Sequence, residues 1–385
     1  MHGSYDTKNY ADINLTALTH NYRTLLRMIR KKDPLADAIC VVKADAYGHG
    51  AAACVRALSA AGAHFFAVSD IAEALEVRSI LKDASILILG YTRPSNAPLL
   101  AEKRIIQTVH NAEYARYLQT ALDAAVSSSL IARDARLPIH VKLDSGMNRL
   151  GFSIGTPDFD RSITEILALR AHKNLAPEGI FTHFACADEP TSPMTDVQNC
   201  RFMAALDRLS ANGMQLASHA ANSAAAVRFG AMGYCYARLG IALYGIPPSD
   251  EVTLPALRPV MSLYSRISEI HTLRKGDSIS YGARFVAPRD MRVATVAIGY
   301  ADGILRACED GGCFVIGGKP VPIIGRICMD QCMVDLGDAE AYEGDPVTVY
   351  DAKGENLTRL ANAARTIPYE LLCLTGRRVH HRYIQ

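Results

Sequence analysis

The sequence predicts an α/β protein in which an N-terminal (β/α)8 barrel of the TIM type precedes a C-terminal, mostly antiparallel β domain. Two observations predict this fold. Apolar runs of strand length alternate with alanine- and leucine-rich helical stretches, and eight such units match the length of a barrel. Beyond about residue 250, short β-branched runs separated by glycine and proline replace the helical stretches. We therefore expect domains at residues 11–250 and 251–385.

The first domain is expected to begin with a short alternating strand and a helix within residues 11–30, with Thr16 as a candidate N-cap. Helices are also expected at residues 50–61 and 70–82, where alanine, leucine and arginine are frequent. The eight barrel strands are predicted at residues 38–43, 65–69, 85–90, 105–109, 138–144, 178–184, 216–221 and 236–241.

The second domain is predicted from runs rich in β-branched residues, each bounded by glycine or proline. These runs are SLYSRISEIHTL, SISYGARF, RVATVAIGY, CFVIGGKPVPIIGRICM, CMVDL and DPVTVYD. Residues 357–372 return to a helical pattern in two pieces divided by Pro368. The following GRRVHHRYIQ is expected to form a final edge strand, with His380 and His381 on its surface.

Composition excludes several classes of protein. The formal net charge of +2 leaves no basic excess to neutralise nucleic-acid phosphates. No run of about 18 apolar residues predicts a membrane span, and the polar first residues lack the apolar core of a secretory signal. The ten cysteines form no C-x2-C zinc pair, so we expect no metal and a reduced, cytoplasmic setting. These features do not exclude a soluble piece of a longer, membrane-attached protein.

Lys43 stands where a buried strand should end, directly after AICVV and before the polar loop ADAYGHG. Buried lysines have lowered pKa values and act as Schiff-base nucleophiles and general bases. The alternative interpretation is a lysine that extends from the top of the strand into solvent. The stretch by itself leaves both interpretations open.

The ends of the other predicted strands favour the chemical interpretation. Active sites of such barrels lie at the C-terminal ends of the strands, and phosphate is often bound after strands seven and eight. Here the predicted strands end in polar residues, and Asn222 and Ser223 follow strand seven while Gly240 and Ile241 follow strand eight. A phosphate site opposite a strand-end lysine suggests pyridoxal phosphate. The polar strand ends are Lys43, Lys142 with Asp144, His183, His219 and Arg238.

Eight motifs, in order along nearly the whole chain, make the resemblance specific. They are VVKADAYGHG, KLDSGMNRLGF, THFACADE, HAANSAA, ARLGIALYG, SYGARF, GYADG and GRICMDQ. Together they resemble the alanine racemases, which are fold-type III pyridoxal-phosphate enzymes. The resemblance implies a barrel followed by a β domain, a head-to-tail homodimer with shared active sites, and alanine as the substrate.

The resemblance also implies residue roles. Lys43 resembles the cofactor-bound lysine that acts as one catalytic base, and Tyr281 the second base, donated by the other subunit. Lys142 resembles a lysine that is often carbamylated, although it could instead pair with Asp144. The cofactor residues implied are Lys43, Tyr47, Leu89, Arg149, His183, His219, Asn222, Ser223, Arg238, Gly240, Ile241 and Tyr369, and the substrate residues are Arg149, Met329 and Asp330.

Other activities of the same fold are the main alternatives. One alternative is a serine or broad-specificity racemase. A serine-preferring relative is expected to carry a smaller or polar residue at the Tyr369 position, whereas the bulky Tyr369 and Leu89 leave room for alanine. A decarboxylase usually places a glutamate, not an arginine such as Arg238, at the pyridine nitrogen. A non-catalytic pyridoxal-phosphate carrier would lack residues 250–385. D-alanine for the bacterial cell wall is the purpose that the resemblance implies.

Overall fold

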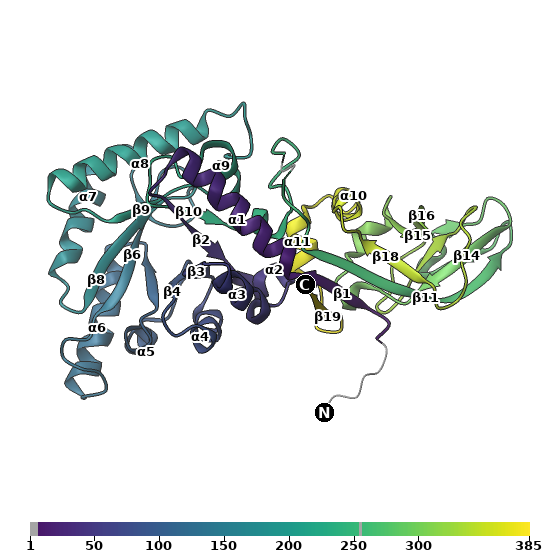
Figure 1. Ribbon diagram of the computed structural model, residues 1–385, viewed down its shortest axis with the longest axis horizontal. Coiled ribbons are helices and arrows are strands. Elements are labelled where there is room, and N and C mark those ends of the chain that lie inside the picture. The colour runs from purple at the N-terminus through teal and green to yellow at the C-terminus, as the bar shows by residue number, and fades with distance from the viewer. Residues whose placement is uncertain (1–6, 254–255) are drawn as a thin grey trace.

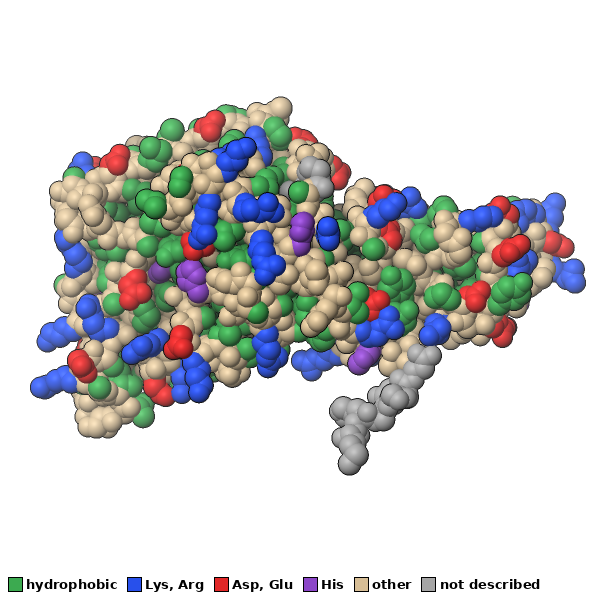
Figure 2. Space-filling view, viewed as in Figure 1, with side chains coloured by type: hydrophobic (Ala, Val, Ile, Leu, Met, Phe, Trp, Pro, Cys, Tyr) green, Lys and Arg blue, Asp and Glu red, His purple; other side chains and the backbone are tan. Residues whose placement is uncertain are grey.

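The structure, a computed structural model, describes residues 7–253 and 256–385. It has two lobes, a barrel surrounded by helices and a lobe built mainly of strands (Figure 1). On the face shown in Figure 2, basic and acidic side chains are interspersed over both lobes. None of the described helices is long and apolar enough to cross a membrane.

Eight parallel strands form the barrel, and the ring closes because the first strand pairs with the last. The predicted TIM-type barrel and its eight strands are confirmed. An extra two-residue strand, β7 (Phe152–Ser153), pairs with the end of β6. The barrel strands are β2 (Asp37–Val41), β3 (Phe65–Val68), β4 (Ser85–Ile88), β5 (Ile106–Val109), β6 (Leu137–Asp144), β8 (Leu175–Phe181), β9 (Ala217–His219) and β10 (Tyr236–Leu239).

Helices follow the strands and bury one apolar face each against the barrel. They are α3 (Ala51–Ala60), α4 (Ile71–Ile80), α5 (Ala97–Glu102), α6 (Ala112–Ser127), α7 (Phe159–Ala168), α8 (Met194–Ala211) and α9 (Ser223–Phe229). The flank between β10 and β2 is covered by α1 (Leu15–Lys32), which precedes the barrel in the chain and packs between α3 and α9 (Figure 1). The eighth covering helix therefore comes from the beginning of the barrel segment.

The N-cap of α1 differs from the sequence prediction. Asn14, and not Thr16, caps the helix, because the Asn14 side chain accepts the backbone N–H of Ala17 at 2.8 Å. Thr16 lies one residue inside the helix. Asparagine is among the strongest N-cap residues, so the prediction was wrong by two positions within a polar stretch.

The second lobe is built on an eight-stranded sheet that is mostly antiparallel, as predicted. The long strand β11 (Met261–Leu273) pairs with β18 in its first half and with β14 in its second, so six strands close into a ring. The remaining strands of that ring are β14 (Met291–Val296), β15 (Cys313–Ile316), β16 (Lys319–Ile324), β17 (Cys332–Asp335) and β18 (Pro346–Tyr350). A separate hairpin pairs β12 (Ser278–Ile279) with β13 (Phe285–Val286).

Two strands from distant parts of the chain extend this sheet beyond β11. The strand β1 (Tyr10–Asn14) pairs antiparallel with β11, and β19 (His380–Ile384) pairs parallel with β1 as the predicted edge strand. Before β19, the helices α10 (Glu355–Ala363) and α11 (Pro368–Cys373) form the two predicted pieces, and Pro368 begins the second. The segment before the barrel is thus part of the second lobe's sheet.

One buried side chain ties α1 to the segment that leaves the barrel. Asn21 donates to the carbonyls of Leu243 at 2.9 Å and Arg258 at 2.7 Å, and accepts the N–H of Arg258 at 2.9 Å. Its side chain is fully buried. The bond to Leu243 is buried, and the two bonds to Arg258 are partly buried.

We predict that Asn21→Leu, which keeps the side-chain volume, leaves these backbone groups unpaired and lowers the free energy of unfolding by about 2–4 kcal/mol. Urea denaturation followed by circular dichroism measures this loss. The control is Arg23→Leu on the exposed face of the same helix, which should change the midpoint little. Equal shifts for both variants would contradict the role given to Asn21.

Candidate active site

A cavity of about 790 Å³ opens at the C-terminal ends of the barrel strands. Its wall gathers side chains that are far apart in sequence because parallel strands end at the same edge of a barrel. The residues from the sequence analysis that line it are Lys43, Tyr47, Leu89, Lys142, Arg149, His183, Asn222, Ser223, Arg238, Gly240, Ile241 and Tyr369.

Four residues of the sequence-based set do not line this cavity. His219 is fully buried beneath Arg238. Tyr281 and Met329 lie in the second lobe, with 69% and 52% of their surface exposed. Asp330, also in the second lobe, pairs with Arg378 at 2.7 Å.

The polar loop predicted after the first barrel strand is a tight turn of unusual hand. The strand ends at Val41, and Lys43 begins the short element α2 (Lys43–Gly48). Four consecutive residues there, Ala44 to Tyr47, have φ between 52 and 55°. The left-handed conformation costs non-glycine residues about 1–2 kcal/mol each, so the surroundings must hold this turn.

Two carboxylates hold the left-handed turn by accepting backbone N–H groups. Glu73 of α4 accepts from Ala44 and from Ser69, each at 2.6 Å, and so links the turn to the end of β3. Asp45 accepts the N–H of Ala51 at 2.6 Å, at the start of α3. The turn places Lys43 and Tyr47 on the same cavity wall.

Tyr47, Ser223 and Gly240 form a cradle of polar groups. The Ser223 hydroxyl accepts the backbone N–H of Gly240 at 2.9 Å and of Ala242 at 3.4 Å, so its own proton remains free to bind another acceptor. A side chain on Gly240 would lie 2.7 Å from the Tyr47 hydroxyl oxygen, which explains the glycine. Burial raises the pKa of both Tyr47 and Tyr369, so both phenols stay protonated and can donate. Such donors suit a phosphate group.

Arg238 lies at the base of the cavity and is almost wholly buried. Its Nη1 donates to His219 Nδ1 at 2.7 Å, and its Nη2 approaches His183 Nδ1 at 3.0 Å and the Thr182 carbonyl at 2.8 Å. Its Nε has no acceptor among the described residues, although Arg238 lines the cavity. An arginine N–H can only donate, so this position suits the unprotonated nitrogen of an aromatic ring.

The cationic groups of the cavity depress one another's proton affinity. Burial, and then the charge of Arg149, lower the pKa of Lys43 and bring that of Arg238 to about 9. Burial, with the charge of Arg238, lowers the pKa of Lys142 to about 7 and that of His183 well below its usual value. Lys43 and Lys142 therefore reach the neutral, nucleophilic form more readily than a surface lysine.

Sequence reasoning missed several residues of the cavity wall. Phe181 lies under both Lys142 and Arg238, whose charged groups are 5.4 and 5.3 Å from its ring centroid. Asp188, inside the motif THFACADE, and Cys373 also line the cavity. Glu73 does not line the cavity, but it holds the left-handed turn that carries Lys43 and Tyr47. Of these four residues, only Asp188 could have been found from the sequence, because it is an acidic residue inside one of the eight family motifs.

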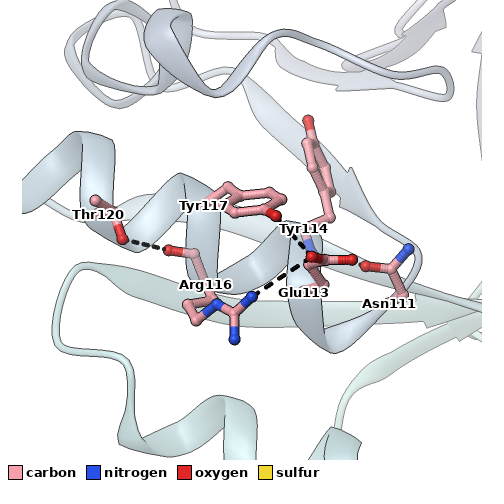
Figure 3. A network of polar contacts seen from close by, with 6 residues as sticks. All are labelled: Asn111, Glu113, Tyr114, Arg116, Tyr117 and Thr120. Atoms are coloured by element: carbon pink, nitrogen blue, oxygen red, sulfur yellow. Dashed lines mark hydrogen bonds and ion pairs between the residues drawn. The ribbon is translucent and has the colours of Figure 1, made fainter.

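A second cavity, of about 700 Å³, lies between the start of α6 and α7, and none of the predicted site residues lines it. Some of its polar groups bond to one another or to the first turns of α6. Glu113 accepts from the Tyr117 hydroxyl at 2.6 Å and pairs with Arg116 at 3.5 Å, and Asn111 caps α6 through the N–H of Tyr114 (Figure 3). The network stabilises the first turns of α6.

Comparison with known families gives a consistent result over both lobes. Residues 13–248 match the model of the alanine racemase N-terminal domain, and residues 260–383 match that of the C-terminal domain. An alanine racemase of Desulforamulus reducens is 38% identical over 379 residues, which cover 97% of this chain and 98% of that protein. Alanine racemase 2 of Caldanaerobacter subterraneus is 37% identical over 382 residues, covering 97% and 94%.

Solved structures agree with these matches. An alanine racemase of Clostridium difficile 630 superimposes with a TM-score of 0.88 at 34% identity, covering 99% of this chain and 97% of that one. The crystal structure of the Bacillus anthracis alanine racemase with bound L-Ala-P also has a TM-score of 0.88, at 32% identity, covering 100% and 96%.

The state of Lys142 can be tested by its chemistry with carbon dioxide. No carboxylate pairs with Lys142 in the part of the chain that the structure describes, and Asp144 instead accepts the N–H groups of Gly146 and Asn148. Because its pKa is about 7, the neutral amine predominates above that pH and can add to carbon dioxide, losing one proton to give a carbamate. We predict this modification at Lys142.

With carbon-13 bicarbonate, the carbamate resonance should be stronger at about pH 8 than at about pH 6, because the amine loses its proton between them. Lys142→Met, which keeps the length of the side chain, should abolish the resonance. A resonance that persists in Lys142→Met, or its absence from the unaltered protein at both pH values, would exclude carbamylation of Lys142.

Proposed function

The chain belongs to the alanine racemase family, and from this premise we propose that it interconverts L-alanine and D-alanine with pyridoxal 5'-phosphate as cofactor. The observation that carries the proposal is a single cavity that joins a lysine of lowered pKa, a cradle of hydroxyl and N–H donors, and a buried arginine with an unused N–H. A ring that carries an aldehyde, a phosphate and a basic nitrogen needs these three kinds of partner.

The residues of the cavity suit the cofactor group by group. Lys43 is the amine that would hold its aldehyde carbon, while Tyr47, Ser223 and the Gly240 backbone would bind its phosphate. Arg238 would face its ring nitrogen through Nε. When bound, pyridoxal phosphate supplies an electron sink that makes the Cα–H of the attached amino acid acidic.

Racemisation requires a proton to leave one face of Cα and return to the other, so two bases are expected. Lys43, with its lowered pKa, is the base on one face. Tyr281 is the proposed base on the other. Arg149, Met329 and Asp330 are proposed substrate-binding residues, with Arg149 near the phenolate oxygen of the cofactor and Met329 and Asp330 of the second chain near the substrate carboxylate. Because Arg238 keeps its proton near neutral pH, it leaves the ring nitrogen unprotonated, which limits side reactions such as transamination.

A second copy of the chain would supply Tyr281. This residue is exposed on the second lobe and does not line the cavity of its own chain. Met329 is exposed on the same lobe. We therefore propose a head-to-tail homodimer in which the second lobe of each chain completes the cavity of the other.

Alanine is favoured over larger substrates by the bulk of the cavity wall. Tyr369 and Leu89 both line it and would crowd any side chain larger than a methyl group. A serine or broad-specificity racemase of the same fold is the alternative function. We further propose that the enzyme acts in the cytoplasm and supplies D-alanine for peptidoglycan.

We predict that the purified protein with pyridoxal phosphate converts L-alanine to D-alanine, as detected by chiral chromatography, and that serine is turned over more slowly. Lys43→Ala should lower kcat at least about 10³-fold, because it removes both the cofactor anchor and one base. It should also remove the visible absorption of the lysine-bound cofactor. Absence of alanine racemisation by the loaded wild-type protein would refute the proposed function.

If each active site is shared between two chains, two inactive variants should complement each other. Lys43→Ala and Tyr281→Phe chains should each be inactive alone. Refolded together from an equal mixture, they should recover up to about a quarter of wild-type activity, since about half of the dimers are mixed and each has one intact site. The control is either variant refolded with itself. Activity no higher in the mixture than in the controls would exclude a site completed by the second chain.

A further inference from the structure

Two buried histidines extend inward from Arg238 into the core of the barrel. His219 of β9 places Nδ1 2.7 Å from Arg238 Nη1, and its Nε2 lies 3.0 Å from Nδ1 of His140 on β6. His219 is fully buried, and His140 and Arg238 are each 3% exposed. The three side chains form a column, defined here as Arg238, His219 and His140, in which only Arg238 lines the cavity.

The direction of both hydrogen bonds is set by Arg238. A guanidinium group has donors and no acceptor, so His219 must present an unprotonated Nδ1 to it. The single proton of a neutral His219 then lies on Nε2 and is donated to His140. His140 must in turn present an unprotonated Nδ1, which leaves its own proton on Nε2.

Both histidines are kept neutral by their surroundings. Burial, and then the positive charge of Arg238, bring the pKa of His140 to about 3 and lower that of His219 well below its usual value. A second proton on either ring would also set two N–H groups against each other within the column. Each ring therefore holds one proton, on the nitrogen that lies farther along the chain of bonds from Arg238.

The position of His140 is set by the strand beside it. Gly179 of β8 is the register partner of His140, and a side chain at Gly179 would lie 2.4 Å from two atoms of the imidazole. The ring of Phe65 contacts the imidazole edge-on, with centroids 5.9 Å apart. The glycine thus leaves room for the His140 ring in one position.

We propose that His140 is a positioning residue, which fixes the tautomer and orientation of His219 and thereby holds Arg238 beneath the ring nitrogen of the cofactor. The proposal rests on the proposed function, because it is there that Arg238 faces this nitrogen. Without His140, the His219 Nε2–H is buried without an acceptor. A shift of that proton to Nδ1 would then turn an N–H toward Arg238 and displace it.

The first test reads the tautomers directly and does not depend on activity. In nitrogen-15 histidine spectra of the holoenzyme at neutral pH, both His219 and His140 should show an unprotonated Nδ1 and a protonated Nε2. The single substitutions His140→Leu and His219→Leu assign the two rings. A protonated Nδ1 on His219, or a doubly protonated His140, overturns the proposal, whether or not alanine is racemised.

The second test separates positioning from packing. His140→Asn keeps an acceptor near the position of Nδ1, whereas His140→Leu keeps bulk without one. The leucine variant should raise the dissociation constant for pyridoxal phosphate and lower kcat about tenfold each, with KM for alanine within about twofold. The asparagine variant should recover most of both losses. Equal losses in the two variants overturn the proposal.

Gly179→Ala and Leu122→Ala complete the comparison. Gly179→Ala keeps His140 but displaces its ring, so it should resemble His140→Leu in cofactor affinity and in the His219 tautomer. Leu122 is fully buried in α6 and lies outside the column, so Leu122→Ala should lower thermal stability and leave both readouts unchanged. Should His140→Leu fail to fold, the tautomers of the wild-type holoenzyme and the effect of Gly179→Ala still decide the question.

Discussion

The structure of the barrel interior depends on the burial of Arg238 without a carboxylate. Among the described residues no acid pairs with it. Its Nη1 and Nη2 groups donate to backbone carbonyls and to the Nδ1 atoms of His219 and His183, while Nε is left without an acceptor in that part of the chain. A buried charge without an ion-pair partner costs several kcal/mol unless hydrogen bonds satisfy its donors. His219 and His183 can accept from Arg238 only while their Nδ1 atoms are unprotonated, and burial keeps both rings neutral. The positive charge of Arg238 also adds to burial in lowering the pKa of Lys142. For Lys142, His183 and His219, burial is the first cause of the lowered pKa and the charge of Arg238 is the second.

The barrel could be predicted from the sequence because its evidence is local. Each strand is a short apolar run and each helix an amphipathic stretch, so eight strands were found with boundaries wrong by only a few residues. The left-handed turn after β2 could not be predicted. Its four residues include two alanines, which ordinarily favour right-handed helix, and the turn depends on Glu73 from another helix. The pairing of β1 with β11 could not be predicted from local sequence patterns either, because it joins segments about 250 residues apart.

The sequence predicted those residues of the candidate site that are charged and stand at the end of an apolar strand. Lys43, Lys142 and Arg238 stand at strand ends, where an apolar residue would be expected, and all three line one cavity. Of the three residues in the buried column, Arg238 and His219 were predicted and His140 was not. His140 precedes Lys142 by two residues on one strand, so alternation places both side chains on the interior face, and this spacing could have revealed it. Phe181 gave no signal, since a buried phenylalanine in a strand is ordinary. Tyr281 was singled out by the family motif alone.

The position of β1 has a consequence for the order in which the chain acquires its structure. Ribosomes add about 5–20 residues per second, so roughly 12–50 s pass between the synthesis of β1 and the arrival of β11, its first partner. During that time β1 has both of its edges unpaired, because its two partners, β11 and β19, have not yet been made. Unpaired edges attract other strands. The nascent chain therefore carries an early-made strand that needs protection until β11 and then β19 emerge to enclose it.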